Sequence, residues 1–289
     1  MIHQTADDWR NSRQKHVLLF GMSGLGKTRL SSILREAGDW FHYSIDYRIG
    51  TRYMGEHIAD NFKAEAMKNP FLANLLRTDS VYISSNITFD NLAPLSTYLG
   101  KPGDPAKGGL PFAEYMRRQA LHAEAEIASL RDTVRFIDRA RTLYGYDSFI
   151  CDSSGSICEV VDPWDDADPV LELLSQHLLL VWIEGTEEHT EELIRRARKQ
   201  PKPMYYSPGF LTESWQDYMR ENNVLEDEVD PDDFTRATFA KALKRRRPRY
   251  AEMARRWGLK VSAEATASVR DPADFEAMIA DALDARMRG

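Results

Sequence analysis

The segment of the sequence with the clearest chemistry is a glycine-rich stretch near the N-terminus. Residues 21–28 read GMSGLGKT, which fits the pattern G-x-x-x-x-G-K-[ST] at every defined position. Glycines let backbone N–H groups approach phosphate oxygens without a Cβ in the way, and the N-terminus of a following helix adds a positive dipole end. A lysine here reaches the β- and γ-phosphates of a nucleotide, and the next hydroxyl ligates Mg²⁺. The predicted nucleotide-binding residues are Gly21, Met22, Ser23, Gly24, Leu25, Gly26, Lys27 and Thr28.

Two aspartates follow other apolar runs and are the candidates for metal binding and for proton transfer. Asp152 closes the run 148–151 and is the candidate second Mg²⁺ contact beside Thr28; the alternative is a cap for the turn that follows. Asp46 closes the run 40–45 and is expected to orient or deprotonate an attacking hydroxyl; the alternative is a helix N-cap. Arg48 and Arg52 lie close enough in sequence to hold an anionic substrate.

The elements that must position these residues alternate between strands and helices. Short continuous apolar runs are typical of strands buried on both faces of a parallel sheet, and helical patterns lie between them. Such alternation predicts an α/β doubly wound fold that binds ligands beyond the carboxyl ends of its strands. The predicted strands are 16–20, 40–45, 148–151, 178–183 and, more weakly, 259–262, and the predicted helices are 28–37, 187–199 and 273–287.

Two intervals break this alternation. Residues 53–145 read as a mostly helical insertion, with helices over 56–76 and 111–143 around a turn-rich stretch at 100–109. Such a length far exceeds an ordinary connection. Residues 201–233 read as irregular and rich in aromatic and acidic side chains.

Composition narrows the class of protein. The 289 residues include 38 Lys and Arg against 45 Asp and Glu, a formal charge of −7, which argues against wholesale nucleic-acid binding. Two cysteines, Cys151 and Cys158, are too few for a disulfide framework. No apolar run approaches the roughly 18 residues of a membrane helix, and residues 1–15 lack the apolar core of a signal peptide. We therefore expect a cytoplasmic protein with reduced thiols and no membrane partner.

The order of motifs resembles that of small-molecule P-loop kinases, the superfamily of shikimate, gluconate and nucleoside monophosphate kinases. The resemblance covers about 180 of 289 residues. It rests on the phosphate loop, on Asp46, and on the SSGS stretch after Asp152, where shikimate kinases carry a glycine triplet. It also rests on the segment 181–203, similar to the family's strand, helix and start of the lid, and on 247–254, similar to its R-x-P-x-Y-x-E-x-A helix. Residues 259–283 then resemble the closing strand and helix.

The resemblance implies a three-layer α/β/α fold with a five-stranded parallel sheet and a mobile lid. The implied core is 14–54 with 146–289, the lid is about 199–245, and 55–145 is an insertion that provides an acceptor or partner site. The implied chemistry is Mg²⁺-dependent transfer from ATP to a small hydroxyl- or phosphate-bearing acceptor. Gly155 would contact the acceptor, and Arg247 would lie near the adenine.

The sequence departs from the family at three points. The glycine triplet is replaced by Ser154-Gly155-Ser156, Lys202 stands where the lid begins with arginine, and the insertion is longer than the family's substrate helices. Shikimate is therefore not the expected acceptor.

Further arginines are candidates for phosphate contacts. Arg195 and Arg198 could reach the transferring phosphoryl group in cis; the alternative is a solvated helix face with pairs such as Glu191 with Arg195. Arg117 could face an anionic group of the acceptor.

Three functions fit these residues. A phosphotransferase using ATP and Mg²⁺ is the first. A regulatory ATPase that binds a protein partner through residues 55–145 is the second. A nucleic-acid end kinase using the basic run 244–249 is the third, and the net charge argues against it.

Overall fold

The computed structural model describes residues 2–288 and divides them between two compact units. We call Met1–Ile45, Ile127–Pro201 and Arg236–Gly289 the sheet unit, and Asp46–Glu126 with Lys202–Thr235 the helical unit. Two long helices, α7 (Phe112–Tyr144) and α12 (Pro231–Trp257), contribute residues to both.

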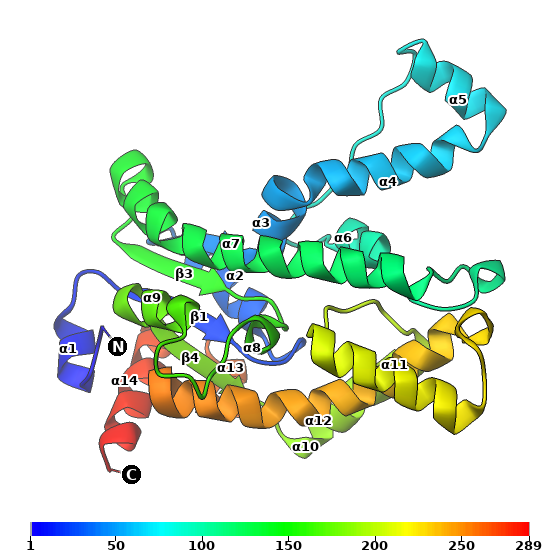
Figure 1. The fold of residues 1–289 in the computed structure, drawn as a ribbon. Helices are drawn as coiled ribbons and strands as arrows, with labels where there is room; N and C mark the ends of the chain where they lie inside the picture. Colours follow the sequence, from blue (N-terminus) through cyan, green and yellow to red (C-terminus); the bar gives the residue numbers. More distant parts are fainter. Residues whose placement is uncertain (1, 289) are drawn as a thin grey trace. The chain divides into compact units, whose positions relative to one another are not determined.

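The sheet unit is built on five parallel strands in the order β2-β3-β1-β4-β5 (Figure 1). The interior strands are almost wholly buried, as their continuous apolar runs require. The predicted α/β class with a five-stranded parallel sheet is confirmed. The strands are β1 (His16–Phe20), β2 (Trp40–Ser44), β3 (Ser148–Asp152), β4 (Leu179–Glu184) and β5 (Gly258–Ser262).

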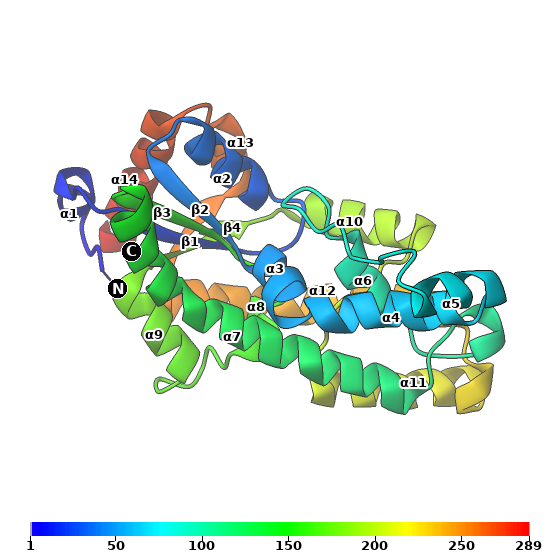
Figure 2. The same ribbon diagram turned by 90° about the horizontal axis from the view of Figure 1, so that it is seen from above.

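Helices cover both faces of this sheet. In Figure 2, α2, α13 and α14 lie on one side of the strands, and α8 and α9 lie on the other. α1 packs on α14, where the Trp9 indole donates to the Glu276 carbonyl at 3.0 Å. The bounds are α1 (Ala6–Asn11), α2 (Lys27–Glu36), α8 (Ile157–Val160), α9 (Pro169–His177), α10 (Glu187–Lys199), α13 (Ala263–Ser268) and α14 (Pro272–Arg288).

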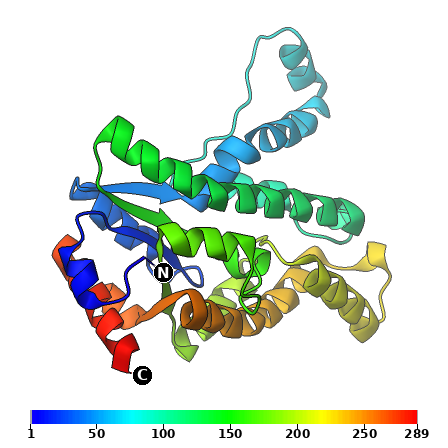
Figure 3. The ribbon, with the colours of Figure 1, turned by 60° about the vertical axis from the view of Figure 1, so that its left-hand side comes forward.

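The helical unit consists of short helices and turns. In Figure 3 an extended segment, drawn in cyan, runs back from the tip of the α4–α5 hairpin. The turn at residues 101–110 is fastened to the start of α12, because Lys101 pairs with Asp232 at 2.5 Å and Lys107 pairs with Asp230 at 3.2 Å. Its elements are α3 (Ile45–Arg48), η1 (Ile49–Tyr53), α4 (Gly55–Met67), α5 (Pro70–Arg77), α6 (Ala93–Leu99), η2 (Pro105–Lys107), α11 (Pro208–Asn222) and η3 (Glu226–Glu228).

Three local predictions are wrong. The single helix over 56–76 is two helices, because the Asn69 side chain caps α5 and Pro70 starts it. The interval 201–233 is not irregular throughout, since α11 occupies Pro208–Asn222. β2 ends at Ser44, so Asp46 does not close a strand and lies in the first turn of α3, where a carboxylate suits the helix dipole.

No helix within residues 2–288 is long and apolar enough to span a membrane. Cys151 in β3 and Cys158 in α8 are both free and buried, and burial raises the pKa of the Cys158 thiol to about 12. Both thiols therefore stay protonated and unreactive near neutral pH.

The Gly258→Ala variant tests how closely β4 and β5 approach. A Cβ at Gly258 would lie 2.1 Å from the backbone oxygen of Leu180, so the strands must separate. We expect a loss of about 1–3 kcal/mol in the free energy of unfolding, measured by urea denaturation. Gly209→Ala in α11 is the control, because nothing lies within 4 Å of its Cβ; that change should stabilise by at most about 1 kcal/mol. Equal effects of the two variants would contradict this packing.

His42 in β2 should make the protein less stable in acid. Burial, aided by the Arg35 charge, lowers the pKa of His42 to about 4 from 6.5. The unfolded state therefore binds a proton more tightly, and stability that is complete above pH 6.5 is lost as the pH falls toward 4. Relative to His42→Gln, the wild type should lose about 2–3 kcal/mol between pH 7.5 and 4.5 in urea titrations. A parallel decline of both proteins would refute this.

Candidate functional site: a phosphate loop beside a buried aspartate

The loop between β1 and α2 has a backbone that only glycine accommodates well. Gly21 has φ +137°, and a Cβ there would lie 2.8 Å from the Ile183 backbone oxygen of β4. Gly26, at φ +91°, is the N-cap of α2. Because glycine has no side chain, the first turn of α2 receives no side-chain hydrogen bond from its N-cap. The N–H groups at the start of α2 are thus available to an anion, as the sequence pattern predicts.

Lys27 is buried, and its ammonium group lies within the curve of this loop. Its Nζ donates to the carbonyl oxygens of Gly21 at 2.9 Å and Met22 at 3.1 Å. Its side chain therefore supplies a positive charge beside the N–H groups of the loop. An anion with several oxygens, such as a polyphosphate, suits this combination.

Thr28 and Asp152, the two predicted metal ligands, lie side by side. The Thr28 hydroxyl donates to Oδ2 of Asp152 at 2.6 Å, and Asp152 is only 6% exposed. Burial raises the pKa of Asp152, while the Lys27 charge and the Thr28 hydrogen bond act in the opposite direction. A hydroxyl and a carboxylate oxygen this close are ligands that Mg²⁺ accepts when phosphate oxygens complete its shell. The residues present therefore fit the implied Mg²⁺–nucleotide.

The turn after β3 packs against the phosphate loop. A Cβ on Gly155 would lie 2.9 Å from Oγ and 3.6 Å from the backbone N of Ser23. The Gly155 carbonyl accepts hydrogen bonds from Tyr250 Oη at 2.6 Å and from Arg246 Nη1 at 2.9 Å. Gly155, a predicted acceptor contact, thus lies beside the loop with its carbonyl already engaged.

In the sheet unit, the predicted arginines Arg195 and Arg247 pair with glutamates on the surface. Arg247 pairs with Glu187 at 2.8 Å, and both side chains are exposed. The Glu192 carboxylate accepts hydrogen bonds from both Arg195 and Arg196 on α10. Arg195 therefore pairs with Glu192 and not with the expected Glu191. The Arg198 carbonyl accepts from Arg236 Nε at 3.0 Å. Phosphate contacts by Arg195, Arg198 or Arg247 remain predictions.

The predicted acceptor residues of the helical unit fall into two groups. Asp46 and Arg48 lie on α3, and the Arg48 guanidinium sits 5.6 Å from the centre of the Tyr53 ring. Arg117 instead lies on α7 in a two-point pair with Glu114, at 2.7 and 2.9 Å. The Arg117 hydrogen bonds, with a further one from Arg118, lower the pKa of Glu114 to about 2, so this one carboxylate is shared by two guanidinium groups.

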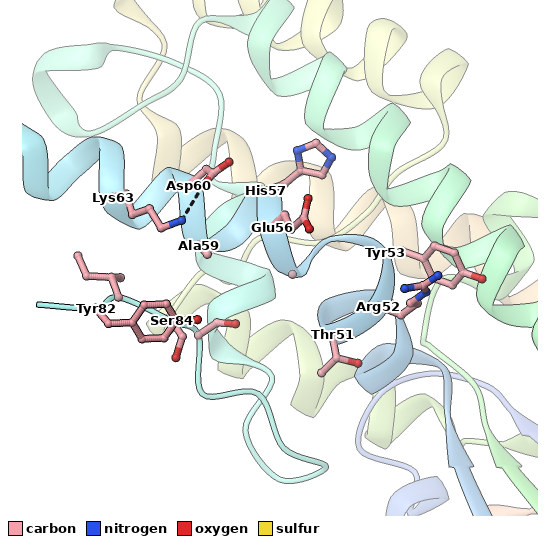
Figure 4. Close-up of a pocket in the computed structure, with 13 residues that line it drawn as sticks. Thr51, Arg52, Tyr53, Glu56, His57, Ala59, Asp60, Lys63, Tyr82 and Ser84 are labelled. Atoms are coloured by element: carbon pink, nitrogen blue, oxygen red, sulfur yellow. Dashed lines mark hydrogen bonds and ion pairs between the residues drawn. The ribbon is translucent and has the colours of Figure 1, made fainter. Parts of the chain in front are cut away.

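Arg52 lines an open cavity of about 780 Å³ in the helical unit. Figure 4 shows Glu56, His57 and the Lys63–Asp60 pair of α4 facing Tyr82 and Ser84 of the extended segment across it. Lys63 pairs with Asp60 at 3.0 Å. The wall is polar and mixed in charge, which suits a hydroxyl-bearing ligand better than an apolar one.

The sequence did not point to the buried ion pair between Arg246 and Glu159. Their side chains are 2% and 1% exposed, and Arg246 Nε lies 3.0 Å from Oε1 of Glu159. The two residues are 87 positions apart, so no local spacing connects them. The basic run 244–249 contains Arg246 but gives no sign of a buried partner.

No protein-family model matches this chain, and no curated protein matches it. Among solved structures, a shikimate kinase from Bacteroides thetaiotaomicron is similar at 14% sequence identity and a TM-score of 0.38, over 95% of this chain and 97% of that chain. A likeness of this degree carries no argument about activity. The sheet order and the phosphate loop described above, and not this likeness, are the grounds for the α/β fold.

Proposed function

We propose that this protein is an ATP- and Mg²⁺-dependent phosphotransferase that acts on a small hydroxyl- or phosphate-bearing acceptor. The observation that carries the proposal is the 2.6 Å contact between Thr28 and Asp152 at the uncapped start of α2. A glycine loop, a buried lysine and two oxygen ligands for a metal together form a site for a nucleoside triphosphate.

Charge stabilisation is the main task of the nucleotide residues. The loop N–H groups and Lys27 would hold the β- and γ-phosphates and counter the charge that builds up during transfer. Thr28 and Asp152 would hold Mg²⁺, which would neutralise part of that charge. Lys27 and Asp152 are buried and already hydrogen-bonded, so their positions are set before a nucleotide binds, whereas Thr28 is exposed.

Asp46 is the proposed proton acceptor. The acceptor oxygen would form a bond to the γ-phosphorus, the bond from that phosphorus to the bridging oxygen would break, and ADP would leave. The hydroxyl proton would pass to Asp46. Arg48 and Arg52 would bind anionic groups of the acceptor, with Gly155 and Arg117 as further proposed contacts and Arg195, Arg198 and Arg247 as proposed phosphate or adenine contacts.

A second candidate is a nucleotide-dependent switch that binds a protein partner. It is favoured by the exposed apolar side chains of the α4–α5 hairpin and the segment that follows: Met67 (38%), Phe71 (70%), Leu72 (38%) and Tyr82 (86%). Apolar side chains gathered on a surface often mark a contact with another molecule.

The metal ligands can be tested by nucleotide binding. Thr28→Val and Asp152→Asn should each weaken MgATP binding by about 10–100-fold in titration calorimetry, since each removes one oxygen ligand. Binding of ATP in EDTA should change by less than about 3-fold, because the loop is intact. Thr142→Val is the matched control, as its exposed hydroxyl only donates to the Asp138 carbonyl of its own helix. An unchanged affinity in both site variants would contradict the assignment.

The acceptor reaction can be tested by a metabolite screen for stimulated ADP formation. With an acceptor found, Asp46→Asn should lower acceptor-dependent ADP formation by about 10²–10⁴-fold while the affinity for MgATP stays within about 3-fold. Asp90→Asn, an exposed aspartate of the same unit, is the control. Slow ATP turnover that no acceptor stimulates, together with a complex lost on Phe71→Ser, would favour the switch instead.

A further inference from the structure

Side chains on one face of α12 hold the segment that follows β3. Arg249 donates to the carbonyls of Cys158 at 2.6 Å and Val161 at 2.8 Å, and Arg256 donates to the Pro163 carbonyl at 3.3 Å. Arg246 and Tyr250 both donate to the Gly155 carbonyl. Arg249, Tyr250 and Arg256 follow Arg246 by 3, 4 and 10 positions, which places these donors on one side of α12.

The innermost of these contacts is a buried ion pair. Arg246 is 2% exposed and contacts Glu159 through Nε and Gly155 through Nη1. Withdrawing two charges from water is costly, and well-packed apolar side chains of similar size are often as stable. The pair therefore needs a reason besides stability. Its geometry supplies one, because the guanidinium group fixes the Gly155 carbonyl of the turn and the Glu159 carboxylate of α8 at once.

The fixed group, Gly155, is also where this turn meets the phosphate loop. Its Cα lies against Ser23 so closely that a Cβ would come within 2.9 Å of the Ser23 hydroxyl oxygen. The backbone N–H of Ser153 donates to the Leu19 carbonyl of β1 at 3.1 Å. The turn is thus held by α12 on one side and supports the loop on the other, directly after Asp152.

We propose that Arg246, Tyr250 and Glu159 are positioning residues of the nucleotide site, acting through the Gly155 carbonyl and without touching the nucleotide. They hold residues 153–156 against Ser23 and thereby fix the loop relative to Asp152. The ligand whose binding depends on them is the Mg²⁺-bound triphosphate. This inference rests on the proposed function.

A double variant separates positioning from stability. Arg246→Met alone would leave the buried Glu159 charge without its ion-pair partner. The substitution is therefore combined with Glu159→Leu, so that an apolar pair replaces the ion pair. The double variant should fold, with circular dichroism and a melting temperature close to those of the wild type. Its Kd for MgATP, measured by calorimetry at a temperature where it is fully folded, should rise at least 10-fold.

Tyr250→Phe provides a second, milder variant. It deletes one hydroxyl and one of the two donors to Gly155, so folding should be retained while the Kd for MgATP rises at least 3-fold. Added to the double variant, it should raise the Kd further. Arg255→Met is the matched control, because Arg255 lies exposed on the same helix and pairs with Glu252; it should leave the Kd unchanged.

The outcomes distinguish the inference from the function on which it rests. Lys27→Ala serves as the reference for a disabled loop. If the wild type binds MgATP no better than Lys27→Ala, the proposed function fails. If the wild type binds MgATP and the folded double variant and Tyr250→Phe bind it equally well, the function stands and the inference is overturned, with Arg246 left as a residue of stability alone.

Discussion

The pairing of β1 with β3 is the constraint on which the proposed nucleotide site depends. In a parallel sheet the carboxyl ends of neighbouring strands meet at one edge. Leu19 lies opposite Asp152 in this register, so the loop that follows β1 and the carboxylate that ends β3 emerge together. A shift of one residue would turn Asp152 to the other face of the sheet and separate it from the Thr28 hydroxyl.

Burial strengthens the electrostatic interactions of the few charged groups at and behind this site. Lys27, Asp152, Glu159 and Arg246 are each less than 10% exposed, and a charge in such a place is costly unless it is matched. Lys27 is matched by loop carbonyls, Asp152 by the Thr28 hydroxyl, and Arg246 and Glu159 by each other. Because water screens these contacts poorly, small displacements change their energy strongly. A site of this kind therefore needs a rigid support behind it, and side chains of α12 provide one at Gly155.

Local signals explain what the sequence could predict. The strands, the phosphate loop and the neighbourhood of Thr28 and Asp152 follow from apolar runs and from one motif in its strand–helix context. The break at Asn69-Pro70 is also a local signal, an N-cap residue followed by proline, and the prediction of one helix over 56–76 missed it. The Arg246–Glu159 pair could not be predicted from the sequence, because partners 87 residues apart meet only once the whole sheet is assembled. The placement of Asp46 failed because the chain turns into a helix directly after Ser44.

Helix α12 is the structural element that both candidate functions share. Its first turn is fastened by Lys101 and Lys107, and its later turns hold the segment after β3. The helix runs from Pro231 to Trp257, although Pro248 inside it has no backbone N–H to donate to the preceding turn. Asp232, which meets Lys101, and the side chains that hold the Gly155 carbonyl therefore belong to one helix. The two candidate functions share the same proposed nucleotide site, so dependence on an acceptor, and not nucleotide binding, separates them.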